Sequence, residues 1–313
     1  MPKRWILALF VCCFLNAGTL TAQEKSKPKT QNAIPGATTI TSFDQDHTVV
    51  GWLEIIPFES KIFHNTRMLR VLVPANYFSP HNAHRTYPVL YLQDGQNLFD
   101  DATSNSGEWH VDETVEHLVG SFKIPPMFVV GIDHGEKRSS EYLPYPNEHS
   151  QDAAARDPNE VHGSDYVRFL LTEVMPFIEK HYRVARGVMN TGLGGSSYGG
   201  DISLYTVLEH PGIFGHVLLE SPVLSIGNGQ LIKDAEKARQ LPQKMYLGIG
   251  TSETTDQQPS AEIVSSVEEL EKVLRAKGLG PSRLKVVVEQ NAVHNEGAWS
   301  RRLPDALLFL YGK

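Results

Sequence analysis

The sequence predicts an α/β fold in which antiparallel strands precede a mostly parallel, doubly wound sheet. Short apolar runs, typical of strands covered on both faces, alternate with segments whose apolar residues recur at helical spacing. Because strands joined through helices pair in parallel, this alternation favours one open sheet with helices on both faces. The 313 residues, 41% of them hydrophobic, provide ample material for its core.

The strands are expected in the following order. Residues 52–57 and 67–73 alternate between apolar and polar side chains, which predicts two paired antiparallel strands. Residues 187–192 are expected to run as a buried strand into a tight turn. The other buried strands are predicted by nearly continuous apolar runs at residues 87–93, 127–132, 217–219, 245–249 and 284–288.

Helices are predicted between these strands. Apolar residues recur at helical spacing over residues 166–182, 202–208 and 263–274. The second of these segments stops just before Pro211, and Gly278 stands where the third would take a C-terminal cap.

The N-terminal residues are expected to lie outside the folded domain. Residues 1–22 have the order of an export signal, with Lys3 and Arg4 followed by a short apolar stretch and then small and polar residues. Residues 23–39 are polar and predict a flexible tether, which leaves 40–313 as the domain. We therefore expect an exported protein, periplasmic or secreted; an uncleaved anchor is the alternative.

Composition excludes several classes of chemistry. Both cysteines, Cys12 and Cys13, lie in the apolar stretch, so the mature chain would have no thiol nucleophile, redox pair or thiolate metal site. A net charge of −7 without a long basic run makes nucleic acids and anionic membranes poor partners. No histidine pair has a zinc-ligand spacing, and Ser106 replaces the glycine that a calcium loop over 101–112 would need. We predict no metal and no cofactor.

The pentapeptide Gly195-Ser196-Ser197-Tyr198-Gly199 is the strongest functional signal. A G-x-S-x-G sequence between a strand and a helix allows a sharp turn that exposes its serine at the carboxyl edge of the sheet. The helix dipole there favours developing negative charge. A glycine-rich turn without chemistry is the alternative, but the predicted strand and helix on either side favour Ser197 as a nucleophile.

A nucleophilic serine needs a base, and the base needs an acid that orients it. On this type of sheet the three follow in the order serine, acid, histidine. His294 follows the last predicted strand, and Glu253 and Asp256 follow the strand before it. We place Glu253 over Asp256 as the acid because it lies closer to the rigid end of its strand.

Backbone amides must also stabilise the oxyanion that forms when the serine attacks. One amide belongs to the residue after the nucleophile, Tyr198, and the second is expected in the loop after the strand 87–93, at Gln96. A further loop, residues 133–164, is long, polar and follows a strand end. It is predicted to shape the mouth of the site.

Several further motifs accompany the pentapeptide. They are Tyr91-Leu92-Gln93-Asp94-Gly95-Gln96-Asn97-Leu98-Phe99, Gly107-Glu108-Trp109, Val130-Gly131-Ile132-Asp133, Arg138 with Glu141-Tyr142-Leu143-Pro144, Glu220-Ser221-Pro222, and His294-Asn295-Glu296 with Trp299. On these motifs, over residues 60–311, the chain resembles the putative-esterase family of the α/β-hydrolases. The resemblance extends to its siderophore-esterase-like and feruloyl-esterase-like members.

The resemblance implies the α/β-hydrolase fold and an acyl-serine intermediate formed by Ser197, with His294 as base and Glu253 as acid. It further points to substrate contacts at Trp109, Asp94 and Ser221. One position departs from the family pattern: relatives often carry an aspartate on the strand before the acid loop, where this chain has Gly248.

The expected activity is hydrolysis of a small-molecule or saccharide carboxylic ester. Two alternatives remain at this point: an acyltransferase that uses the same acyl-enzyme, and an inactive hydrolase fold that serves as a binding module. Siderophore lactones, feruloylated or acetylated polysaccharides and short acyl esters all fit the same predicted residues.

Overall fold

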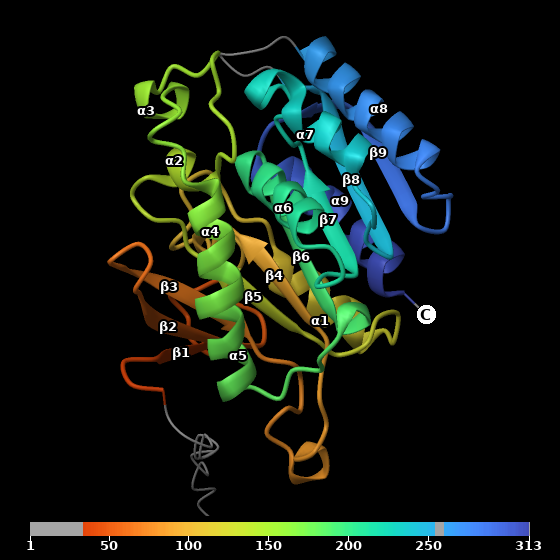
Figure 1. The fold of residues 1–313 in the computed structure, drawn as a ribbon. Helices are drawn as coiled ribbons and strands as arrows, with labels where there is room; N and C mark the ends of the chain where they lie inside the picture. The colour runs from red at the N-terminus through yellow and green to blue at the C-terminus, as the bar shows by residue number, and fades with distance from the viewer. Residues whose placement is uncertain (1–33, 254–259, 313) are drawn as a thin grey trace, which may run out of the picture. The chain divides into compact units, whose positions relative to one another are not determined.

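Nine strands form one sheet in this computed structural model, which describes residues 34–253 and 260–312 (Figure 1). Their order across the sheet is β1-β2-β3-β5-β4-β6-β7-β8-β9. The strands are β1 (Thr38–Thr41), β2 (Trp52–Ser60), β3 (Asn65–Leu72), β4 (Val89–Gln93), β5 (Phe128–Ile132), β6 (Thr191–Ser196), β7 (His216–Glu220), β8 (Lys244–Ser252) and β9 (Leu284–Val293).

The pairing confirms the predicted fold class. Strands β1, β2 and β3 pair antiparallel, and β3 also pairs antiparallel with β5. From β5 through β4, β6, β7 and β8 to β9 every pairing is parallel. The sheet is therefore an antiparallel start joined to a parallel body, as expected for an α/β-hydrolase.

Helices cover both faces of the sheet (Figure 1). Those against the first core, built around Leu193, Leu219 and Leu247, are α2 to α8. The second core contains Leu118 of α1 and Leu307 of α9. The helices are α1 (Val111–Gly120), α2 (Arg138–Tyr142), α3 (Ala153–Arg156), α4 (Gly163–Phe169), α5 (Met175–His181), α6 (Tyr198–Glu209), α7 (Ile226–Lys237), α8 (Ser260–Ala276) and α9 (Glu296–Tyr311).

Most predicted elements lie where the sequence places them. Helix α6 ends at Glu209, just before Pro211, and Gly278 after α8 has the positive φ of +95° that a helix cap favours. The predicted helix over 166–182 is divided into α4 and α5 by a π-helical turn, Leu170–Val174. Strand β1 begins at Thr38, within the segment expected to be a tether.

The strand predicted at 187–192 is placed wrongly. Residues Val188–Asn190 form a 3₁₀ turn in which Met189 is 57% exposed, and the buried strand is β6, Thr191–Ser196. The glycines of β6 have a low strand propensity, but the packing of the sheet requires them. A Cβ on Gly194 would lie 2.5 Å from the Leu218 carbonyl oxygen.

The loop predicted over 133–164 is not wholly irregular. It contains the short helices α2 and α3 and leads into α4. Two backbone bonds bring its far end back to α2: His162 N–H donates to Ser140 O (2.8 Å) and Gly163 N–H to Leu143 O (3.0 Å). The segment is therefore a folded layer above the sheet edge.

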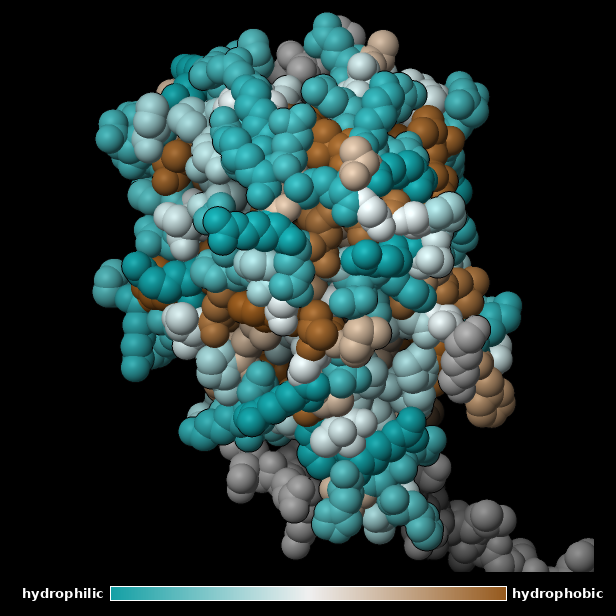
Figure 2. Space-filling model, turned by 45° about the vertical axis from the view of Figure 1, so that its right-hand side comes forward, coloured by the Kyte–Doolittle hydropathy of each residue, from teal (hydrophilic) through white to brown (hydrophobic). Residues whose placement is uncertain are grey.

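The surface in Figure 2 is mostly hydrophilic, with hydrophobic side chains in small patches between polar ones. Large exposed hydrophobic residues such as Phe43 and Phe122 are far apart in the chain. Among the helices of the described residues, none is both long and apolar enough to cross a bilayer.

Asp201, in the first turn of α6, is a buried carboxyl group. Within the described residues neither of its oxygens makes a hydrogen bond. Burial raises the pKa of Asp201 well above its ordinary value, and the Val223 N–H and the Arg138 charge offset only part of that rise. Burial therefore favours the neutral form of this group in the folded protein.

We expect Asp201→Asn to stabilise the protein at neutral pH. Above pH ~3.9 the unfolded chain releases the Asp201 proton while the folded chain keeps it, so each pH unit up to the folded pKa lowers the free energy of unfolding by about 1.4 kcal/mol. Asparagine does not titrate, so the gain should be largest near pH 7 and should vanish towards pH 4. Urea unfolding of both proteins from pH 4 to 7.5 measures this, and parallel pH profiles would contradict it.

Candidate active site

The site is built where the parallel strands end. The carboxyl ends of β4, β6, β7, β8 and β9 lie at the same edge of the sheet, because these strands pair in parallel. Each of the predicted site residues after these strands is therefore brought to one edge.

Ser197 occupies a strained turn between β6 and α6. Its φ of 55° and ψ of −132° are unfavourable for a residue with a side chain, and its N–H donates to Glu220 O at 2.9 Å. The flanking glycines are required, since a Cβ on Gly195 would lie 2.7 Å from the Gly199 carbonyl carbon, and one on Gly199 would lie 2.9 Å from Gln93 Cβ. This is the geometry of a nucleophile elbow.

His294 and Glu253 meet at the ends of the last two strands. His294 Nδ1 lies 2.6 Å from Glu253 Oε2, and the Glu253 carboxylate is fully buried while the His294 side chain is 20% exposed. Since an ionised carboxylate can only accept, the His294 proton is on Nδ1 and leaves Nε2 free to act as a base. Asp256 lies outside the described residues.

The Glu253 carboxylate has two further donors. The Ser221 hydroxyl donates to its Oε1 at 2.6 Å, and Gly250 N–H donates to the same oxygen at 2.7 Å. Burial alone would raise the pKa of Glu253, but the bonds from His294, Ser221 and Gly250 together lower it below its ordinary value. This favours the charged form of Glu253, as the predicted triad acid requires.

Ser221 and Trp109 occupy supporting positions. Ser221 is fully buried, donates to Glu253 and accepts from Trp299 Nε1 at 2.8 Å. Trp109 is 1% exposed and packs against Trp299 with ring centroids 5.8 Å apart. Both were expected to contact substrate, and the structure places both side chains inside the protein. Trp299, which the sequence motif contained, orients the acid through Ser221.

Position 248, where the chain departs from the family pattern, faces Glu220. The two residues are partners in the β7–β8 pairing, and a Cβ on Gly248 would lie 2.2 Å from Glu220 Oε2. The Glu220 carboxylate is buried and accepts from Arg302 Nε (2.9 Å) and Nη2 (2.7 Å). The space beside position 248 thus holds a carboxylate that comes from the neighbouring strand.

The two predicted oxyanion donors both lie at this edge. Tyr198 is the first residue of α6, and Gln96 lies in a 3₁₀ turn, Gly95–Asn97, directly after β4. Among the described residues neither backbone N–H has an acceptor. Among the described residues, the Ser197 hydroxyl makes no hydrogen bond to His294. Such bonds are often long in an enzyme without substrate and shorten when the substrate binds.

Asp94 connects the Gln96 turn to the elbow. Its φ is 57°, and both its oxygens accept from Arg138, at 2.7 Å from Nε and 2.7 Å from Nη2. Asp94 Oδ2 also lies 3.4 Å from the position of a Cβ on Gly199, two residues after Ser197. Asp94 was expected to contact substrate; the structure places it in a bidentate ion pair that holds the turn.

We expect Arg138→Lys to lower kcat on p-nitrophenyl acetate by about 10²-fold with little change in KM. A lysine cannot make the bidentate pair, and misplacing an oxyanion donor by about 1 Å costs a factor of this size. Arg183→Lys is the matched control, because each arginine lies over a tyrosine ring, Arg138 over Tyr142 (5.1 Å) and Arg183 over Tyr77 (3.8 Å). Arg183, however, donates to backbone carbonyls beside the amino end of β4. Equal losses of kcat in the two variants would refute the role of Arg138.

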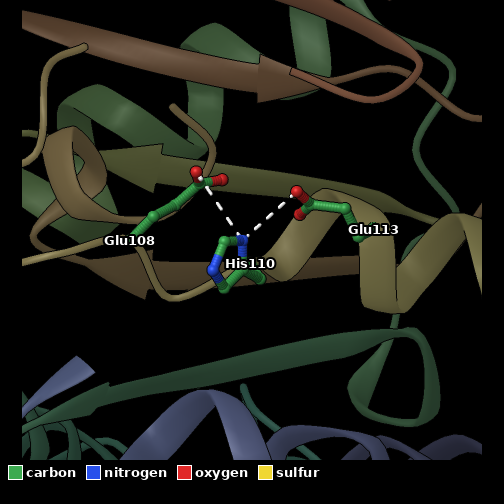
Figure 3. A group of neighbouring side chains, drawn as sticks. All are labelled: Glu108, His110 and Glu113. Atoms are coloured by element: carbon green, nitrogen blue, oxygen red, sulfur yellow. Dashed lines mark hydrogen bonds and ion pairs between the residues drawn. The ribbon is translucent and has the colours of Figure 1, made fainter. Parts of the chain in front are cut away.

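One group of side chains near this edge could hold a cation. Figure 3 shows His110 between two carboxylates, its Nδ1 3.2 Å from Glu113 Oε1 and 3.6 Å from Glu108 Oε2. The sequence spacing did not reveal this group, since its residues follow no ligand motif. It lies at the start of α1 and contains none of the residues predicted to carry the reaction.

The chain was then compared with known proteins. A family model described as “Putative esterase” matches residues 60–310. The chain belongs to this family. The esterase is also similar to two proteins of Bacillus subtilis (strain 168). It is 25% identical to the uncharacterized protein YbbA over 228 residues, 72% of this chain and 86% of YbbA, and 26% identical to YjcH over 225 residues.

Solved structures share the fold of this esterase. A ferulic acid esterase superposes with a TM-score of 0.62 at 18% identity, covering 88% of this chain and 98% of that one. An IroE-like serine hydrolase from Shewanella oneidensis has a TM-score of 0.62 at 18% identity, with 83% and 80% covered. The enterobactin esterase FES of Shigella flexneri has a TM-score of 0.61 at 19% identity, and the match spans 82% of this chain but 59% of FES.

Proposed function

We propose that this esterase cleaves carboxylic esters through an acyl-serine intermediate on Ser197. The observation that carries the proposal is the 2.6 Å bond between His294 Nδ1 and the buried Glu253 carboxylate, at the sheet edge where Ser197 occupies its strained turn. The family assignment supports ester hydrolysis as the reaction.

In the first half of the proposed reaction, His294 Nε2 takes the proton from Ser197 Oγ as that oxygen attacks the ester carbonyl carbon. The carbonyl oxygen becomes an oxyanion that accepts hydrogen bonds from the Tyr198 and Gln96 N–H groups. The tetrahedral intermediate then collapses, the bond to the alcohol oxygen breaks, and His294 gives its proton to the leaving alcohol.

In the second half, His294 takes a proton from water, whose oxygen attacks the acyl-serine carbonyl carbon. Collapse of this second intermediate breaks the bond to Ser197 Oγ, which recovers the proton from His294, and the carboxylic acid leaves. Glu253 stays ionised throughout and stabilises the imidazolium that forms in each half.

A fluorophosphonate probe tests the nucleophile directly. We expect one covalent adduct on the wild-type protein, located at Ser197 by peptide mass spectrometry, together with hydrolysis of p-nitrophenyl acetate. A folded protein that takes up no probe and cleaves no ester would instead be an inactive hydrolase fold.

We also propose that the protein acts outside the cytoplasm. Residues 1–22, which lie outside the described residues, have the charge and hydropathy order of a cleaved signal. We expect the exported protein to begin near Gln23 and to contain no thiol, since Cys12 and Cys13 are removed. Intact mass of the protein from the extracytoplasmic fraction decides this, and a full-length product confined to the cytoplasm would refute it.

A further inference from the structure

A cavity of about 690 Å³ lies at the same sheet edge, on the antiparallel side of the Gln96 turn. The turn between β2 and β3 and the start of β3 form one wall, residues 62–63 and 65–68. The loop after β5, residues 133–137, forms another, and Glu141, His162 and Asp165 complete the lining. A volume of this size holds a group much larger than a short acyl chain.

The cavity adjoins the turn that carries the proposed oxyanion donor. His134 N–H donates to Gln96 Oε1 at 3.4 Å, and a Cβ on Gly95 would lie 2.7 Å from Asp133 Oδ1. Lys137, at the end of this wall, directly precedes Arg138, which holds Asp94. An ester whose carbonyl oxygen reaches the Gln96 N–H therefore has one substituent next to the cavity.

The cations that line the cavity are already paired. Arg67 donates to both oxygens of Glu141, at 2.7 and 3.1 Å, and the Lys137 ammonium lies 3.7 Å from Glu160. The remaining guanidinium nearby, Arg70, is bidentate on Asp133 at 2.7 and 2.9 Å. Both guanidinium groups are thus occupied, and carboxylates outnumber cations in the described lining, where Asp133, Glu136, Glu141 and Asp165 stand against Arg67 and the exposed Lys137.

One carboxylate of the lining has no such partner. Glu136 is exposed and makes no ion pair with any described residue, whereas Asp165 lies 3.2 Å from Arg168. The apolar part of the wall consists of Ile62, Phe63 and Met68. The cavity thus offers apolar surface, polar groups and one unneutralised negative charge.

We propose that this cavity binds the larger substituent of the ester and that this substituent is uncharged, with an apolar face and hydroxyl or similar polar groups. The proposal rests on the proposed ester hydrolysis and adds the substrate class. An anionic substituent finds no unpaired guanidinium there and is repelled by the excess of carboxylates, of which Glu136 is exposed and has no ion-pair partner among the described residues.

The test uses pairs of aryl esters that differ only in a neutral carboxamide or an anionic carboxylate, placed on the acyl group in one pair and on the alcohol in the other. For the wild type we expect kcat/KM to favour the carboxamide in one of the pairs by about fivefold, the upper range for a solvent-exposed charge interaction. Glu136→Lys should abolish or reverse that preference. Glu262→Lys, an equal change of net charge at an exposed position of α8, should leave it as in the wild type.

The outcomes separate this inference from the proposed function. If p-nitrophenyl acetate is cleaved but both ester pairs show no preference, or if the two lysine variants behave alike, the cavity does not select the substrate. If no ester is cleaved by the folded protein, including p-nitrophenyl acetate, the proposed function itself fails.

Discussion

Ser197→Ala is expected to lower kcat for ester hydrolysis by about 10⁶-fold, as for other serine nucleophiles. Without the hydroxyl there is no acyl-enzyme, and only binding and the oxyanion donors remain. Stopped or continuous assays with p-nitrophenyl acetate measure the loss, and circular dichroism checks the fold.

Ser196→Ala is the matched control, because Ser196 is the last residue of β6 and is buried, one position before the elbow. Its variant should keep a rate near that of the wild type. Loss of activity in Ser196→Ala with activity retained in Ser197→Ala would show that the neighbouring serine is the nucleophile.

Glu253→Gln should lower kcat by about 10²–10⁴-fold, up to the loss known for a triad acid. The amide keeps the shape of the side chain but removes the charge that stabilises the imidazolium. Its NH₂ group can also face Nδ1 and favour the wrong tautomer of His294. Steady-state kinetics of the purified variant give the factor.

Asp256→Asn serves as the comparison for Glu253→Gln and should be nearly silent. Since Asp256 lies outside the described residues, kinetics decide between the two carboxylates. A large loss in Asp256→Asn alone would move the acid to that position. Two silent variants would indicate that Ser197 and His294 act as a dyad.

The order of residues along the chain was sufficient to predict the parts of the site that follow strand ends. Parallel pairing brings every such end to one edge, so locating strands β8 and β9 also placed Glu253 and His294 within reach of each other. The glycine pattern similarly predicted the turn at Ser197, because its steric requirement is local.

Features that depend on contacts between distant segments could not be predicted in this way. Arg138 belongs to a sequence motif, but its partner, Asp94, lies 44 positions earlier in the chain. Similarly, nothing in the sequence around Trp109 indicated that its ring would pack against Trp299 and not lie at the surface. Strand β6 was misplaced because the glycines that its packing needs have low strand propensity. The cavity beside Gln96 likewise arises from three separate segments.

The pairing of Glu220 with Gly248 bears on which substitutions this chain can accept. Any side chain at position 248 would meet the Glu220 carboxylate, since a Cβ there would lie 2.2 Å from Glu220 Oε2. In this chain an acidic residue at 248 therefore needs a smaller residue at 220. Placing both acids would overfill the site, while exchanging them in one double variant should restore a folded protein.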